Sequence, residues 1–224
     1  MNEAKTEEYV IKSGGKDDWK TCKYLGSMLD SEKDINRQKQ LSMASFHKYK
    51  YILQSKKLSL EVRICLFNAY VTSIFMYNSE IWTLTKKMEE DINIFQRKLL
   101  RKILKIRWPH VISNEELYSR TSESNWSEVI KQRRLRWLGH LLRLPIDSPA
   151  RVALNEFNIK CKRKRGRSKL TWIELVNNDF NIINKDFSVN SESILNLAAD
   201  REMWRRVVVY GLPAMSTSDV QQPE

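Results

Sequence analysis

Basic side chains gathered in the second half of the sequence are the residues best suited to chemistry, and that chemistry is contact with phosphate. Thirteen Lys or Arg lie between Lys131 and Lys169, against only Asp147 and Glu156. The whole chain has 39 Lys plus Arg and 27 Asp plus Glu, a formal charge of +12, so nearly all of the net charge falls in this segment. Charge that only maintained solubility would be spread along the chain. The clustering therefore predicts a surface for a polyanion such as RNA or DNA.

Helical spacing groups many of these cations on single faces. Arg97, Arg101 and Lys105 are four residues apart and lie opposite the apolar side of their expected helix. On a later helix four more basic residues fall within a quarter turn of one another: Arg133, Arg136, His140 and Arg143. The run KRKRGR follows. A solvated helix face is the alternative for any one of them, and a nuclear-import signal is the alternative for KRKRGR. The expected nucleic-acid contacts are Arg97, Arg101, Lys105, Arg133, Arg136, His140, Arg143, Lys162, Arg163, Lys164, Arg165 and Arg167.

Cysteine and histidine spacing predicts no metal site and no cofactor. There is no CxxC pair and no zinc-finger spacing, so reduced thiols are expected. Asp17 and Asp18 are the one pair of adjacent aspartates, but they follow Gly-Gly-Lys in a polar turn without a flanking apolar strand, and we do not expect them to bind metal. The isolated residues are Cys22, Cys65, Cys161, His47, His110 and His140.

Composition predicts a globular protein that does not enter a membrane. The chain has 224 residues, of which 42% are hydrophobic and 10% aromatic, enough to bury a core. Charged residues interrupt every apolar run well short of the ~20 residues that cross a bilayer. The first residues, MNEAKTEEYV, have no signal-peptide pattern. A nuclear location, or a cytoplasmic one as ribonucleoprotein, is therefore expected.

Hydrophobic periodicity in the first half predicts strands and then helices. Residues 1–30 contain two strand-like segments, EYVIKS and TCKYLGSML, joined by the turn-like SGGKDD. A helix is expected after a cap formed by Ser31 and Asp34, a second after Ser59, and a third from about Thr85. The second should be the most buried element, through an apolar surface made by Val62, Cys65, Leu66, Ala69, Tyr70, Ile74 and Phe75.

The second half is expected to be helical throughout. Ser113 with Glu116, and Asn125 with Glu128, have the spacing of capping boxes, and the second should open a helix that ends near Leu144. Together these two helices resemble a helix-turn-helix. The longer one should pack through Ile130, Trp137, Leu138 and Leu141.

A basic linker at 160–169 should separate this region from two further helical segments. These are LTWIELVNNDF and SESILNLAADREMWRRVVVY, with Gly211 and Pro213 ending the second. The polar residues 212–224 are expected to be disordered.

Six motifs that follow KYLG (Lys23, Tyr24, Leu25, Gly26) make the sequence resemble one known family. KYLG is similar to the primer-grip hairpin of non-LTR, LINE-type retrotransposon reverse transcriptases. The later motifs occur in the same order in the RTE-like branch of these elements, and the resemblance extends to Gly211. They are YNSEIWTLT, FQRKLLRKILKIRW, SNEELY, RRLRWLGHLLRLP, KRGRSKLTW and DREMWRRVV.

The resemblance implies that the chain holds nucleic acid without performing polymerisation. Asn2 and the segment Lys5-Thr6-Glu7 look like the end of the polymerase palm, so the chain is expected to begin just past the catalytic aspartates. Polymerases of this class need those carboxylates to hold two Mg²⁺ ions. The complete parent enzyme would bind Mg²⁺ and carry an endonuclease domain, whereas this chain is expected to be no enzyme and to need no cofactor.

The resemblance also implies a mainly α fold, with a short N-terminal β-hairpin followed by a helical thumb-like bundle and a smaller C-terminal helical region. The missing palm domain and host nuclear proteins are further candidate partners. Two alternatives remain: a truncated record of an active RNA-directed DNA polymerase and endonuclease, or a host-adopted nuclear interaction scaffold. The expected domains are 1–30, end of the palm and primer-grip hairpin; 31–109, thumb-like domain; 110–159, helix-turn-helix-like basic region; 160–169, basic linker; 170–211, C-terminal helices; and 212–224, disordered tail.

Overall fold

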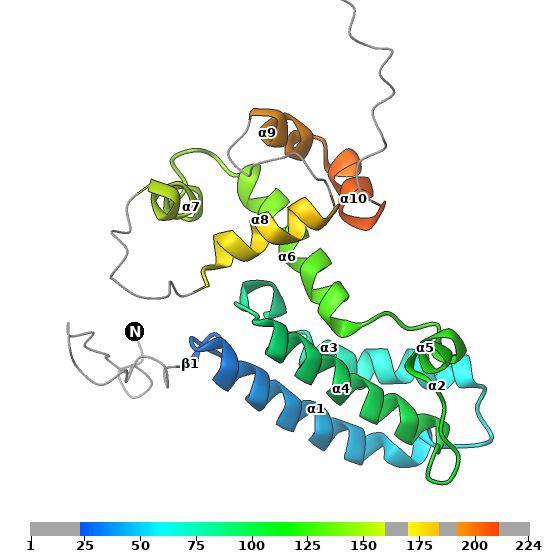
Figure 1. The fold of residues 1–224 in the computed structure, drawn as a ribbon. Coiled ribbons are helices and arrows are strands. Elements are labelled where there is room, and N and C mark those ends of the chain that lie inside the picture. Colours follow the sequence, from blue (N-terminus) through cyan, green and yellow to red (C-terminus); the bar gives the residue numbers. More distant parts are fainter. Residues whose placement is uncertain (1–22, 160–169, 184–191, 211–224) are drawn as a thin grey trace, which may run out of the picture. The chain divides into compact units, whose positions relative to one another are not determined.

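The computed structural model describes residues 23–159, 170–183 and 192–210. They form a mainly helical protein with a short two-stranded antiparallel sheet at the N-terminal side, which confirms the predicted fold class (Figure 1). The chain divides into two compact units, unit 1 (Met1–Ser127) and unit 2 (Glu128–Glu224). The finer division into six segments stays a prediction. The expected strand EYVIKS, the basic linker and the tail lie outside the described residues.

The sheet of unit 1 is a tight hairpin made by KYLG and the residues that follow it. Strands β1 (Lys23–Tyr24) and β2 (Ser27–Met28) pair with Tyr24 opposite Ser27. The two connecting residues both have positive φ, 46° at Leu25 and 90° at Gly26. This is the backbone that suits the twist of a two-residue hairpin, and glycine adopts it without cost. The described turn therefore lies within KYLG, whereas the expected turn SGGKDD lies outside the described residues.

Helix α1 (Ser31–Leu53) starts one residue earlier than its predicted cap implied. The Asp30 carboxylate accepts from the Lys33 amide at 3.0 Å and is the N-cap. The predicted cap of Ser31 with Asp34 is therefore wrong, because Asp34 is fully buried and bonds elsewhere. The apolar part of the buried stripe consists of Ile35, Phe46 and Leu53.

The second helical segment buries a different face from the predicted one. Helix α2 (Leu60–Phe67) has the predicted cap, since Ser59 Oγ accepts from the Val62 amide at 3.3 Å. It continues through a π-helical turn (η3, Asn68–Thr72) into α3 (Ser73–Phe75). Val62, Cys65, Ala69 and Tyr70 are exposed, and the buried residues are Ile64, Phe67, Val71 and Phe75. Apolar residues surround this segment, and the π turn adds a residue that a constant period of 3.6 does not anticipate.

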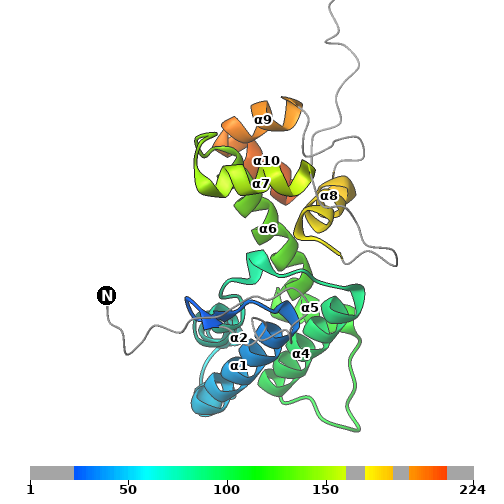
Figure 2. The same ribbon diagram turned by 90° about the vertical axis from the view of Figure 1, so that its left-hand side faces the viewer.

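Helix α4 (Lys86–Leu104) matches its prediction and runs beside α1 in the same direction (Figure 1 and Figure 2). A short 3-10 turn (η4, Ser79–Ile81) precedes it, and Thr85 Oγ1 caps it by accepting from the Met88 amide at 3.3 Å. Helix α5 (Asn114–Thr121) packs against α4 and starts at the predicted cap, Ser113, which accepts from the Glu116 amide at 3.1 Å. The Glu116 carboxylate does not complete a capping box, because it pairs with Arg120 at 2.5 Å.

Aromatic rings and two buried amides complete the core of unit 1. The first residue of helix α6 (Trp126–Leu142), Trp126, stacks on Phe75 with 4.4 Å between ring centroids. Gln96 Oε1 accepts from the Trp126 amide at 2.9 Å, and Asn93 Oδ1 accepts from the Ser127 amide at 3.1 Å. The first amides of a helix have no partner within it, so these buried side chains of α4 satisfy donors that would otherwise be lost.

Unit 2 contains a helix that the sequence interpretation missed. Helix α7 (Pro149–Ile159) begins at a proline that follows Ser148, a common way to start a helix. Helix α8 (Trp172–Ile183) has a complete capping box, with Thr171 Oγ1 accepting from the Glu174 amide at 3.3 Å and Glu174 Oε2 accepting from the Thr171 amide at 3.0 Å.

The last predicted helix of unit 2 is two helices. Helix α9 (Glu192–Ala199) and helix α10 (Arg201–Tyr210) are separated by Asp200. Asp200 Oδ1 accepts from the amides of Glu202 and Met203 at 2.8 and 3.1 Å, so it caps α10. The sequence signal was present, because aspartate is a favoured N-cap.

The core of unit 2 depends on a tryptophan seated on a glycine. The Trp204 indole is buried and donates to the Leu135 carbonyl at 3.0 Å. A Cβ added at Gly139 would overlap that indole. The indole stacks on Phe180, with 5.9 Å between ring centroids. Gly139 therefore allows α10 to approach α6 closely.

Replacing Gly139 with alanine should destabilise unit 2 by about 1–3 kcal/mol, the cost of overpacking a core. Alanine normally stabilises a helix interior relative to glycine by about 1 kcal/mol, so the expected sign is reversed here. Urea denaturation followed by circular dichroism measures the change. Asn196→Ala, at an exposed position of α9, is the control and should be neutral or slightly stabilising. A Gly139→Ala variant as stable as the parent would contradict the proposed packing.

A half-buried carboxylate near the π turn provides a test of unit 1. Glu123 Oε1 accepts from Asn68 Nδ2 at 2.7 Å. Burial raises the pKa of Glu123 although this hydrogen bond opposes the shift. Glu115 is the opposite case, since hydrogen bonds from its own amide and from Ser113 lower its pKa.

Glu123→Gln should stabilise the protein at neutral pH, and the gain should shrink as the pH falls into the range where glutamate is protonated. A raised pKa in the folded state means that ionisation of Glu123 destabilises the fold as the pH rises through that pKa. Glu115→Gln should have the opposite sign, because the stability from a lowered pKa is present at neutral pH and lost in acid. Urea unfolding at a series of pH values measures both. The same sign for both variants would contradict these environments.

Candidate nucleic-acid interface

The KYLG hairpin is held by residues about fifty positions away in the sequence. Tyr77 Oη donates to the Leu25 carbonyl at 2.7 Å, and Asn78 Nδ2 donates to Ser27 Oγ at 2.8 Å. Arg37 of α1 donates to the Gly26 carbonyl at 2.5 Å. The KYLG and YNSEIW motifs therefore form one structure. Its fixed backbone presents exposed side chains at the turn, with Leu25 73% accessible.

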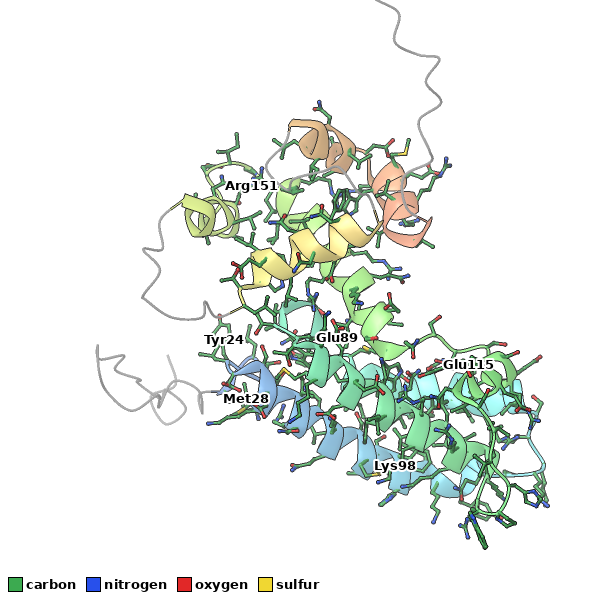
Figure 3. The ribbon with its side chains drawn as sticks, viewed as in Figure 1. Tyr24, Met28, Glu89, Lys98, Glu115 and Arg151 are labelled. Carbon is green, nitrogen blue, oxygen red and sulfur yellow. The ribbon has the colours of Figure 1, made fainter. Side chains whose placement is uncertain are left out.

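A buried carboxylate joins this hairpin to α1 and to the segment before α4. Asp34 Oδ1 accepts from the Met28 amide and Oδ2 from Trp82 Nε1, both at 2.8 Å. Met28 and Tyr24 lie at the end of unit 1 where α1 begins (Figure 3). Ser31 Oγ adds a bond from the Thr83 amide at 3.1 Å. One side chain thus positions three segments.

Asp34→Asn should destabilise unit 1 by about 1–3 kcal/mol, because an amide nitrogen would face one of two buried donors and leave it unpaired. Urea denaturation measures the loss, and faster hydrogen exchange of the Met28 amide locates it. Asp30→Asn is the matched control, since asparagine also serves as an N-cap and should be close to neutral. Equal stability of the two variants would show that Asp34 is not a structural junction.

The predicted cations of α4 are not equally available. The Arg97 side chain is only 13% exposed and pairs with Glu90 at 2.5 Å. Burial opposes its charge, but Glu90 and Tyr118 outweigh that effect and raise the pKa of Arg97. Arg101 donates to Asn114 Oδ1 at 2.8 Å, whereas Lys105 is exposed at the C-cap. Arg97 and Arg101 therefore already have polar partners in their own unit, and their part in binding stays a prediction.

The predicted cations of α6 also divide into two kinds. Arg136 and His140 are exposed, and Arg133 is half-buried with a partner of its own. Arg143 Nη1 donates to the Ala198 carbonyl at 2.9 Å, at the C-terminal end of α9. Burial lowers the pKa of Arg143, and the charge of Arg201 acts in the same direction. Arg143 is therefore engaged in packing α9.

Trp137 was predicted to pack in the core, but it lies on the solvent side of α6. It is 37% exposed, and its ring centroid is 5.1 Å from that of His140. The other members of its predicted apolar face, Ile130, Leu138 and Leu141, are buried. Trp137 thus joins Arg136 and His140 in one exposed group, which we call the α6 patch.

Arg134 belongs to the basic segment, but it does not lie on the surface. It is fully buried and forms an ion pair with Asp179 of α8. Ile130, Arg134 and Leu138 are four residues apart, so they share the inner face of α6. This spacing could have identified Arg134 as an inward-facing residue from the sequence. Considered only by composition, the segment RRLR looks uniformly basic.

The rest of the predicted contacts belong to the run KRKRGR. Lys162, Arg163, Lys164, Arg165 and Arg167 lie outside the described residues. Within 23–159, 170–183 and 192–210, no group of three or more His, Cys, Asp or Glu could hold a metal ion. No helix of these ranges has the length and apolar character needed to cross a membrane.

Comparison with known proteins gives one relevant similarity. The chain is 24% identical over 194 residues to a transposon-derived protein of Caenorhabditis elegans. The aligned region covers 83% of this chain and 68% of that protein. No family model matches the chain, and no solved structure matches it. The similarity indicates a transposon-related origin.

Proposed function

We propose that this chain is a nucleic-acid-binding C-terminal part of an RTE-like non-LTR retrotransposon reverse transcriptase, which holds template-primer or target DNA and is no polymerase by itself. The observation that carries the proposal is the α6 patch, where Arg136 and His140 flank an exposed indole. The transposon-derived relative supports a transposon origin. The order of the KYLG, YNSEIW and RRLRWLGH motifs supports the reverse transcriptase origin.

The α6 patch combines the two contacts that sequence-independent binding of nucleic acid uses. Arg136 has no carboxylate partner among the described residues, so its guanidinium is available to a phosphate. Trp137 offers an aromatic face on which an unpaired base can stack. Positive charge beside an exposed aromatic ring suits single-stranded segments or the end of a hybrid better than the interior of a duplex.

The hairpin is the second element of the proposal. Its turn is fixed by Tyr77, Asn78 and Arg37, while Tyr24 is 65% exposed. In the parent enzyme this hairpin would contact the primer. In this chain it would add a contact for the end of a strand. The nuclear location that the basic sequence predicts is part of the same proposal.

The test compares binding of a fluorescein-labelled RNA–DNA hybrid with a single-stranded overhang to the full chain and to Arg136→Gln/Trp137→Leu. The variant should bind more weakly, and its salt dependence should fall by about one unit of slope for the lost phosphate contact. The lost stacking should cost about 1–3 kcal/mol on the single-stranded part. Fluorescence anisotropy over a salt series gives both quantities.

Arg205→Gln/Trp108→Leu is the matched control, since it removes an exposed arginine and an exposed tryptophan elsewhere. Equal affinity and slope for the α6 variant and this control would refute the α6 patch as the binding surface. A primer-extension assay on the chain alone with Mg²⁺ should yield no product, and nucleotide incorporation would refute the non-enzymatic part. Nuclear retention without measurable RNA or DNA binding would favour an interaction scaffold.

A further inference from the structure

Two stretches of unit 1 contain many cations and no acidic residue. Residues 35–60 and 92–114 have no Asp or Glu. Each contains six Lys or Arg; the first set is Arg37, Lys39, Lys48, Lys50, Lys56 and Lys57, and the second is Arg97, Lys98, Arg101, Lys102, Lys105 and Arg107. Acidic residues elsewhere in unit 1 cancel about half of this charge in the sum, and they lie outside the two stretches.

The fold places these two stretches side by side. They form most of α1 and α4, which pack together in the same direction, and Lys98 lies where α4 runs beside α1 (Figure 3). Lys102 Nζ lies 3.9 Å from Met43 Sδ and 5.7 Å from the centroid of the Phe46 ring, both on α1. Gln54 Nε2 donates to the Lys102 carbonyl at 2.7 Å. The ammonium of Lys102 is therefore held at the junction of the helices.

Four lysines line this junction, and we call them the lysine seam: Lys39, Lys50, Lys98 and Lys102. Lys50 and Lys98 are near enough for their charges to act on Lys102. Asp91 is the acidic group that acts on Lys39, at the other end of the seam. Lys50, Lys98 and Lys102 have no carboxylate partner among the described residues. Three of the four seam lysines thus have no matching anion, and Asp91 acts only on Lys39.

The electrostatics of the seam are unfavourable in the free protein. Burial lowers the pKa of Lys102, and Lys98 and Lys50 lower it further. Burial also lowers the pKa of Lys39, with Asp91 opposing. Like charges near a half-buried ammonium, here the exposed Lys50 and Lys98 beside Lys102, disfavour its protonated state. An anion bound there would remove the repulsion, so the seam gains more from an anionic ligand than isolated surface lysines would.

We propose that the lysine seam binds the phosphate backbone of a nucleic acid and forms a second contact surface, separate from the α6 patch. The inference rests on the proposed function for its choice of polyanion. Lysine is a compact point charge on a flexible stem, so a row of lysines suits repeated phosphates and does not select a base. The other face of α4 differs, because Arg97 and Arg101 already have partners.

The first test is salt-titrated anisotropy with a blunt RNA–DNA hybrid of mixed sequence and the full chain. Lys50→Gln/Lys98→Gln/Lys102→Gln should lower the affinity about tenfold or more near 0.1 M salt, and reduce the salt slope by about two to three. The control Lys33→Gln/Lys86→Gln/Lys87→Gln removes the same charge from exposed positions outside the two acid-free stretches and should have a much smaller effect. Equal effects of the two triple variants would overturn the proposal.

Loss of folding should not account for weaker binding by the seam variant, because removing repulsion in the seam should leave its stability unchanged or higher. A second readout is the pH titration of the Lys102 ε-methylene resonance by NMR. Its pKa should rise when the hybrid binds, in the parent protein and also in Arg136→Gln/Trp137→Leu. No rise at saturation would overturn the proposal. Stronger binding to phosphatidylserine vesicles than to the hybrid, lost in the seam variant, would also overturn it in favour of a membrane surface.

The two proposals fail in distinguishable ways. If the seam variant binds like its control while the α6 variant is weakened, the seam is wrong and the α6 patch stands. If the seam variant is weakened and the α6 variant matches its own control, the seam stands and the α6 patch is wrong. If the parent protein does not bind the hybrid at all, both are wrong.

Discussion

The hydrogen bonds of buried Asp34 are the constraint on which unit 1 depends. Its two oxygens accept from Met28 and Trp82, so one carboxylate connects the hairpin, the first helix and the chain before α4. A buried carboxylate without partners would be too costly to keep, and here both oxygens are satisfied. This junction fixes where α4 starts beside α1. The alignment of the cations along both helices follows from it.

The sequence was sufficient for several interactions that are local. The caps at Ser59, Thr85 and Ser113 involve residues only three positions apart, and all three are present. It was insufficient where a neighbouring element decides, as at Trp137, which was expected inside and is exposed. Arg134 lies in the basic segment 131–169, yet it is buried and paired with Asp179. Periodicity defines the faces of a helix but does not say which face meets a partner.

Charge shows the same difference between the order of residues and their arrangement in space. The largest excess of cations along the chain lies in residues 131–169, and unit 1 has a smaller excess of its own. The fold brings the acid-free stretches of α1 and α4 side by side, so cations of unit 1 are concentrated there, although Glu90 pairs with Arg97 and Asp91 acts on Lys39. Conversely, Arg134 and Arg143 belong to the basic segment but serve packing. Net charge per segment is therefore a poor guide to which residues can contact a polyanion.

The contact between Gly139 and Trp204 also has an evolutionary consequence. The indole occupies the space where any other side chain at 139 would project, and it bonds to the backbone one turn earlier. A lineage that gains a side chain at 139 must also reduce the ring at 204, and a lineage that keeps the ring must keep the glycine. The two positions should therefore vary together among relatives, although 65 residues separate them. This coupling predicts that the RWLGH and REMW motifs are retained or lost as a pair.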